Sequence, residues 1–453
     1  MIRVILASTV LALASCAPTG QPAATRAAVA EAVATLPAPR RFTGPPGLDS
    51  PIPANGQLAR DFLALSFRLE TGRDVPTFTR FEGPVTIAVE GDAPASLHGD
   101  LDELIDRLRR EARIDVSRAA PGERGAITIA ALPRSQLQRQ VPGAACFVVP
   151  RVSGWRDYLA NRFGDTTDWT TLTTRTRASV FLPSDVSAQE IRDCLHEEVA
   201  QALGPLNDLH RLAHSVFNDD NVHVVLTPFD MAILRATYDP ALRSGMTEAQ
   251  VAAALPAVLA RTNPAGRRAD GAAVAESDPD WTTAISDAIT PGGSDNVRLR
   301  QAGRAVALAR AAGWEDERLA FSLLAQGRAA LASDGDLAIA SFLDSAALYD
   351  RLTGDGIHSA QVALQLGALA VSTGRPDAAL AILDRAIPAA GDAQNAALLA
   401  TLLLLRAEAA SMQGARAEAN RTRREGLAWG RYAWGDEVLV RRAAEVAALG
   451  PGT

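Results

Sequence analysis

The order of apolar and polar residues divides most of the chain into two regions of different character. Between about residues 57 and 250, short β-branched runs alternate with stretches in which apolar residues recur at helical spacing. The runs predict strands at 85–89, 126–131, 146–149 and 178–182, and the spacings predict helices at 61–70, 101–112, 187–203 and 228–238. This alternation predicts one α+β domain over residues 57–250.

Beyond residue 297 the pattern is helical throughout, rich in Ala and Leu, and it repeats. Gly335, Gly374 and Gly414 lie 39 and 40 residues apart, and helical stretches follow them at 336–351, 376–387 and 416–429. Helix pairs joined by tight glycine turns stack into solenoids. The segment from Gly374 to Leu380 (Gly-Arg-Pro-Asp-Ala-Ala-Leu) resembles the tetratricopeptide turn and second helix, with a longer period. We expect an all-α, tetratricopeptide-like repeat domain over 297–449, with an ordinary helical bundle as the alternative.

The first residues have the pattern of an export signal. Arg3 precedes an apolar run over residues 4–14, which is far shorter than the roughly 20 residues that a bilayer span needs. The run ends in Leu13-Ala14-Ser15-Cys16, which resembles the lipobox of bacterial lipoproteins. The resemblance implies a signal peptide over 1–15 and acyl chains on Cys16, so the partner at this end is a membrane. The alternative is a signal peptide that carries this cysteine by chance.

The residue after the lipobox bears on location. Ala17 stands where the inner-membrane retention signal usually has Asp. The resemblance therefore favours the outer membrane, within a cell envelope location that faces the periplasm.

Two stretches are predicted to connect the parts. Residues 16–56 are rich in Pro, Ala and Gly, which is typical of a flexible tether between lipid and domain. Residues 251–296 contain Asn-Pro-Ala-Gly and Thr-Pro-Gly-Gly and are predicted to be an interdomain linker, with a short helix expected near Trp281.

Composition excludes several classes of function. Every basic residue is Arg, so reactions that need a lysine amine, such as Schiff-base formation, are excluded. A net charge of −7 gives no basic footprint, and we expect no nucleic-acid partner.

Cys146 and Cys194 remain once Cys16 is assigned to lipid. An even pair in an exported protein predicts one disulfide. Its loop of 48 residues would contribute about 4 kcal/mol in the chain-entropy model. Two separate buried thiols are the alternative.

One segment resembles the long zinc motif of the metzincin peptidases, His-Glu-x-x-His-x-x-Gly-x-x-His. It runs Cys194-Leu-His-Glu-Glu-Val-Ala-Gln-Ala-Leu-Gly-Pro-Leu-Asn-Asp208. By position, Glu197 and Gln201 stand at the two helix ligands, Glu198 at the general base, Gly204 at the turn glycine and Asn207 at the third ligand. The resemblance implies a zincin-like fold.

The zinc ligands themselves are missing from this segment. No His occupies a ligand position, and Gln is a poor ligand for zinc, which prefers N and S donors. Glu197, Gln201, Asn207 and Asp208 could instead offer oxygens to a harder divalent ion. We expect a degenerate, inactive domain without a cofactor. The alternative is an atypical metal-dependent peptidase that uses Glu197, Gln201 and either Asn207 or Asp208 as ligands, with Glu198 as base.

Three histidines follow the metzincin-like segment. His210, His214 and His223 are interpreted as surface or packing residues because no acidic or Cys partner clearly shares their face.

Residues from about 60 to 250 resemble a family of lipoproteins from Gram-negative bacteria catalogued as domain of unknown function 2927. The motifs are the segment from Cys194 to Asp208, then Ser-Val-Phe-Asn-Asp-Asp at 215–220 and Leu-Thr-Pro-Phe-Asp-Met-Ala-Ile-Leu-Arg at 226–235.

These observations favour a membrane-anchored protein that binds or scaffolds without catalysis. A protein partner is expected on the repeat domain, with the peptidase-like domain as a second binding module. A purely structural envelope protein is a further alternative.

Overall fold

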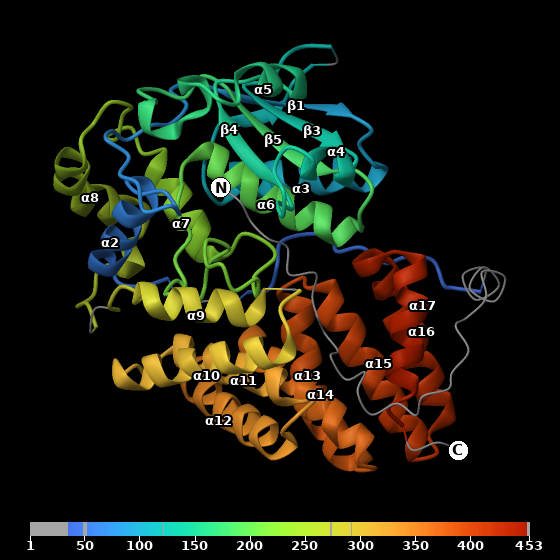
Figure 1. Ribbon diagram of the computed structural model, residues 1–453. Coiled ribbons are helices and arrows are strands. Elements are labelled where there is room, and N and C mark those ends of the chain that lie inside the picture. The colour runs from blue at the N-terminus through green and yellow to red at the C-terminus, as the bar shows by residue number, and fades with distance from the viewer. Residues whose placement is uncertain (1–34, 49–51, 121, 272–273, 291, 451–453) are drawn as a thin grey trace. The chain divides into compact units, whose positions relative to one another are not determined.

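The computed structural model describes residues 35–48, 52–120, 122–271, 274–290 and 292–450. These residues form two compact units (Figure 1). Among the described residues, unit 1 contains those within 43–186 and 190–275, and unit 2 contains 35–42, 187–189 and those within 276–450. The predicted signal peptide, Cys16 and the first part of the tether lie outside the described residues.

Unit 1 is built on a five-stranded sheet with the strand order β2-β1-β3-β5-β4. Neighbouring strands are parallel except β4, which pairs antiparallel with β5 at the edge. The strands are β1 (Val85–Gly91), β2 (Val116–Arg118), β3 (Ile127–Leu132), β4 (Phe147–Pro150) and β5 (Ala178–Pro183). All four predicted strands are present, and the short edge strand β2 was not predicted.

The helices of unit 1 follow and separate these strands. They are α2 (Asn55–Ser66), α3 (Ala95–Arg110), α4 (Arg134–Gln138), α5 (Trp155–Asn161), α6 (Ala188–Leu203), α7 (Pro228–Thr237) and α8 (Glu248–Thr262). Short 3-10 turns lie at Asp165–Thr167, Trp169–Thr171 and Pro264–Gly266. All four predicted helices are present, with ends that differ from the prediction by several residues at α2 and α3.

The two faces of the sheet carry different helices, as the alternation of side chains along β5 shows. Val180 and Leu182 belong to the main core cluster, together with residues of α3 and α6. Phe181, between them, belongs to a second cluster with Leu137 of α4 and Tyr158 of α5. Successive strand residues point to opposite faces, so α6 lies against the α3 side of the sheet, and α4 and α5 cover the other side.

Parts of the predicted tether and linker are folded in this structure. Helix α8 lies within residues assigned to unit 1, and its Val251, Leu255 and Val258 are buried in the main core. Their spacing places all three on one helix face. Helix α2 begins at Asn55, before the predicted domain start, and contributes Leu58 to the same core.

Unit 2 is helical, and helices that follow one another along the chain pack together. The helices are α9 (Pro279–Ile289), α10 (Asp295–Ala311), α11 (Glu317–Ala330), α12 (Gly335–Thr353), α13 (Ile357–Ser372), α14 (Pro376–Asp392), α15 (Ala396–Met412), α16 (Arg416–Trp434) and α17 (Asp436–Ala447). An α/β region with a five-stranded sheet followed by a helix-rich region confirms the predicted order. Helix α9 lies in the predicted linker, and its Trp281 is buried against α10 and α11.

Two of the three repeated glycines end helices by the same hydrogen-bond pattern. At Gly374 the backbone φ is +69°, and the amide of Arg375 donates to the carbonyl of Ala370. At Gly414 φ is +78°, and the amide of Ala415 donates to Ala410 in the same way. This left-handed turn favours glycine. Gly335 differs, since it is the first residue of α12.

Residues 35–42, within the predicted tether, contact α16 inside unit 2. The ring of Phe42 stacks on Trp429 with centroids 4.2 Å apart. The amide of Arg40 donates to the carbonyl of Ala428, and Arg431 donates to the carbonyl of Pro37. This part of the chain is therefore ordered on α16. Across the described residues, no helix combines the length and apolarity that a membrane span requires.

Candidate functional site

The metzincin-like segment forms α6 and the turn that follows it. Glu198 and Gln201 are 2% and 1% exposed, and Glu197 is also buried. Glu197 and Gln201 lie four residues apart and share a helix face, as predicted from their spacing. These side chains therefore lie inside unit 1, where each polar atom needs a partner in the protein or a bound group.

The disulfide joins this helix to the sheet. Cys194 of α6 is bonded to Cys146, just before β4, with their Cα atoms 5.9 Å apart. Both residues are buried. The predicted pairing of Cys146 and Cys194 is therefore present, and it connects segments 48 residues apart.

The turn after α6 brings together only some of the predicted site residues. Nε2 of Gln201 donates to the carboxylate of Asp208 over 3.5 Å, so these two side chains meet. Nδ2 of Asn207 instead donates to the carbonyl of Ala64 in α2 over 3.1 Å. The amide of Leu206 donates to the neighbouring carbonyl of Leu65 over 2.7 Å. The residue at the third ligand position therefore joins the turn to α2.

These contacts allow the donor set to be compared with the needs of a metal. Oε1 of Gln201 is buried and accepts no hydrogen bond from a described residue. This amide oxygen is therefore available to coordinate a metal ion. Zinc prefers nitrogen and sulfur ligands, and the motif positions supply neither. Since Asn207 is also hydrogen-bonded to α2, the residues at the motif positions do not fit a zinc site.

A buried arginine caps the carboxyl end of α6. Arg175 donates to the carbonyls of Gln201 and Ala202 at 2.7 Å each and to that of Gly204 at 2.5 Å. Its Nε donates to Thr79, and its guanidinium lies 4.9 Å from the ring centroid of Trp169. Burial lowers the pKa of Arg175 to about 10, so the group remains charged at neutral pH. A cation here satisfies carbonyls that a helix end leaves without partners and complements the helix dipole.

The motif position of Gly204 implies that glycine is needed to turn the chain. In the structure, glycine is needed here for close packing instead. Its φ does not lie in the left-handed region, so the chain does not need glycine for the turn itself. A Cβ at this position would lie 3.1 Å from Cγ2 of Thr237 in α7. Glycine therefore permits close packing between the end of α6 and α7.

The loop from α6 to α7 is held by one buried carboxylate. Asp230 accepts hydrogen bonds from the hydroxyl of Ser215 and from the amides of Val216 and Thr227, at 2.5, 3.2 and 2.7 Å. Thr227 accepts in return from the amide of Asp230, which completes a capping box at the start of α7. Burial raises the pKa of Asp230 to about 6, although its hydrogen bonds oppose that shift.

A neutral histidine joins α6 to the end of the same loop. Nδ1 of His196 accepts from the amide of Leu226 over 3.2 Å, and Arg107 of α3 donates to the carbonyl of Leu226. Burial, followed by the nearby Arg192 and Arg107, lowers the pKa of His196 well below its usual value. The residue therefore acts as a hydrogen-bond acceptor in the core.

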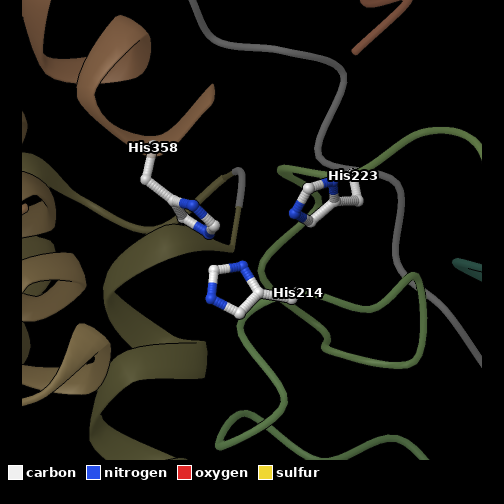
Figure 2. A group of neighbouring side chains, drawn as sticks. All are labelled: His214, His223 and His358. Atoms are coloured by element: carbon white, nitrogen blue, oxygen red, sulfur yellow. The ribbon is translucent and has the colours of Figure 1, made fainter. Parts of the chain in front are cut away.

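The three loop histidines belong to the segment between α6 and α7. His210 and His223 are buried. Of the two predicted interpretations, surface or packing residues, packing is therefore the one that holds for them. The rings of His214 and His223 lie edge to face with centroids 6.5 Å apart (Figure 2). Burial, followed by the neighbouring His214, lowers the pKa of His223 to about 3. The third side chain drawn in Figure 2, His358, belongs to α13 of unit 2 and stacks there on Tyr349.

A second candidate surface lies within unit 2. Leu343 and Ile339 of α12 are 54% and 43% exposed. A hollow of about 450 Å³ lies among α12, α13 and α14, lined mainly by alanines together with Leu366 and Ile382. Short side chains on three adjacent helices leave this space open. We call the exposed residues Ile339 and Leu343, together with the hollow, the α12 surface.

Comparison with known proteins identifies one region of the chain. Residues 55–257 match the family model described as a protein of unknown function, DUF2927. This confirms the family resemblance found in the sequence, and α6 with its following loop lies within the match. No curated protein and no solved structure matches the chain.

Proposed function

We propose that this chain, whose residues 55–257 carry the DUF2927 domain, is a lipid-anchored envelope protein that binds a partner protein without hydrolysing it. The observation that carries the proposal is the α12 surface. Solvent-exposed Leu343 and Ile339 adjoin a hollow of about 450 Å³. Apolar surface next to a concavity is typical of sites that bind another molecule.

The helical region suits this role through its architecture. We propose that α11 to α16 are tetratricopeptide-like repeats, because α13 and α15 end in matching glycine turns 40 residues apart. Each helix packs on the next along the chain, as in solenoids. Such arrays present extended surfaces made of several helices.

Unit 1 suits a non-catalytic role through the bonds that its motif residues make. We propose a degenerate zincin-like fold in which the ligand positions have become structural. Asn207 binds α2, and Gln201 binds Asp208. The carboxyl end of the same helix is occupied by Arg175. These contacts support a scaffold in which α6 fixes the sheet, α2 and the following loop.

Photo-crosslinking in intact cells tests the binding function. A crosslinking amino acid at position 343 of the full chain is expected to give a discrete product with a partner protein. Adding Ile339→Asp is expected to reduce that product about tenfold or more, because a charge in the apolar contact must be desolvated. The matched control places the crosslinker at position 163, since Phe163 is 91% exposed but lies in unit 1.

Two outcomes would contradict the proposed function. One is the absence of any product from position 343, or a product that Ile339→Asp leaves unchanged. The other is hydrolysis of protein substrates by the purified chain that is lost in Glu198→Gln, since Glu198 holds the position of the general base.

The lipid anchor is tested separately at Cys16. In cells fed a labelled fatty acid, Cys16→Ala is expected to abolish incorporation into the chain, because the thiol is the acylated group. Ser15→Ala keeps a small residue before the cysteine and is expected to retain the label. Label that persists in Cys16→Ala would show that the lipobox assignment is wrong.

A further inference from the structure

The hollow of the α12 surface has charged groups at its rim that point to the chemistry of its occupant. We propose that it takes a basic side chain, Arg or Lys, from a partner segment whose neighbouring apolar residues cover Leu343 and Ile339. This inference rests on the binding function proposed above and names the class of partner. It concerns unit 2 alone.

The apolar part of the surface follows one face of α12. Ile339, Leu343 and Ala347 recur at intervals of four residues, so they lie on the same side of the helix. All three are exposed, and Ala347 lines the hollow. The row therefore leads from the two large exposed side chains into the hollow. It is about 12 Å long, at 1.5 Å per residue.

The rim of the hollow carries a net negative charge. Asp350 of α12, Asp355 before α13 and Arg385 of α14 all line it. Arg385 donates to Asp355 over 2.6 Å and to Asp350 over 3.4 Å. The hydrogen bond to Asp355 is the main reason that the pKa of Arg385 is raised. Since one guanidinium faces two carboxylates, these three groups together keep a net negative charge.

A long basic side chain matches both features. Arg and Lys bury their apolar stems along apolar surface while the charged head remains at a polar edge. The alanine-lined wall suits the stem, and Asp350 and Asp355 suit the head. An acidic side chain would meet the remaining negative charge, and like charges in contact oppose association. The preferred occupant is therefore an apolar segment with a basic residue.

Two synthetic peptides test this on the full chain. Both carry leucines four residues apart on a helical sequence, followed two turns later by Arg in one peptide and Glu in the other. Binding is measured by fluorescence anisotropy at low and at raised salt. The Arg peptide is expected to bind about tenfold more tightly at low salt, with a smaller preference at raised salt.

Charge variants of the rim make the result specific. The double variant Asp350→Asn/Asp355→Asn leaves Arg385 as the only charged group of the rim, so the preference is expected to reverse toward the Glu peptide. The matched control Asp336→Asn/Asp392→Asn removes the same charge from exposed positions of α12 and α14 outside the hollow. The control is expected to keep the preference for Arg. Leu343→Ser is expected to weaken both peptides equally.

The outcomes separate this inference from the proposed function. Equal binding of the two peptides, or a preference that survives in the rim variant, would overturn the basic occupant. Crosslinking from position 343 would then still support binding by the α12 surface. If neither peptide binds at low salt, the basic occupant is also overturned. If position 343 also yields no crosslink, the proposed binding function is contradicted as well.

Discussion

Replacing Arg175 by Met is expected to lower the free energy of unfolding of unit 1 by about 3–5 kcal/mol. The guanidinium donates to three carbonyls at the end of α6, and those carbonyls lie in a buried region. Met keeps an apolar side chain of similar length but leaves the carbonyls without a donor and removes the guanidinium that lies over Trp169. The loss is measured by urea denaturation of the full chain, from the midpoint and slope of the transition.

Arg177→Met is the matched control for this experiment. Arg177 lies two residues away, just before β5, and its side chain is exposed. Its replacement is expected to change stability by less than about 0.5 kcal/mol. If both variants unfold at the same urea concentration, then Arg175 does not hold the end of α6 as described.

Removing the disulfide is expected to lower the free energy of unfolding by about 4 kcal/mol in the chain-entropy model. The bond closes a loop of 48 residues between the start of β4 and α6. The variant Cys146→Ala/Cys194→Ala removes it without leaving a reactive thiol in unit 1. Urea denaturation with and without a reducing agent measures the effect.

The wild-type chain under reducing conditions should resemble the double variant under either condition. Because both cysteines are buried, the loss of packing by alanine adds a small further cost. A double variant as stable as the oxidised wild type would mean that the bond does not constrain unit 1.

Local sequence patterns predicted which helices and strands unit 1 contains better than they predicted where these elements end or how the strands pair. The four predicted strands consist of β-branched or apolar runs, which fit a buried, pleated surface and are therefore enriched in strands. The antiparallel pairing of β4 with β5 has no local signal, because pairing direction depends on the path of the chain between strands. Helix α8 contains Pro256 and many alanines, which resemble a linker until Val251 and Leu255 are seen in the core.

The candidate site was predicted where its contacts are close in sequence. The shared helix face of Glu197 and Gln201 follows from their four-residue spacing. The role of Arg175 was missed because its partners lie 26 to 29 residues later. The bond from Asn207 to Ala64 spans 143 residues, and no local pattern marks either end.

In unit 2, too, features that depend on neighbouring residues were predicted, and features that depend on distant residues were not. Gly374 and Gly414 form turns between helices, as their place in the repeat predicts, because a glycine turn ends a helix locally. The hollow beside α12 has no such pattern, because it depends on which short side chains three helices bring together.

Metal content tests most directly whether the metzincin-like positions have become structural. In full-length protein purified without chelators, elemental analysis is expected to find far less than one zinc per chain, and the same value in Glu197→Ala. One tightly held zinc per chain that is lost in Glu197→Ala would contradict the non-catalytic interpretation of α6.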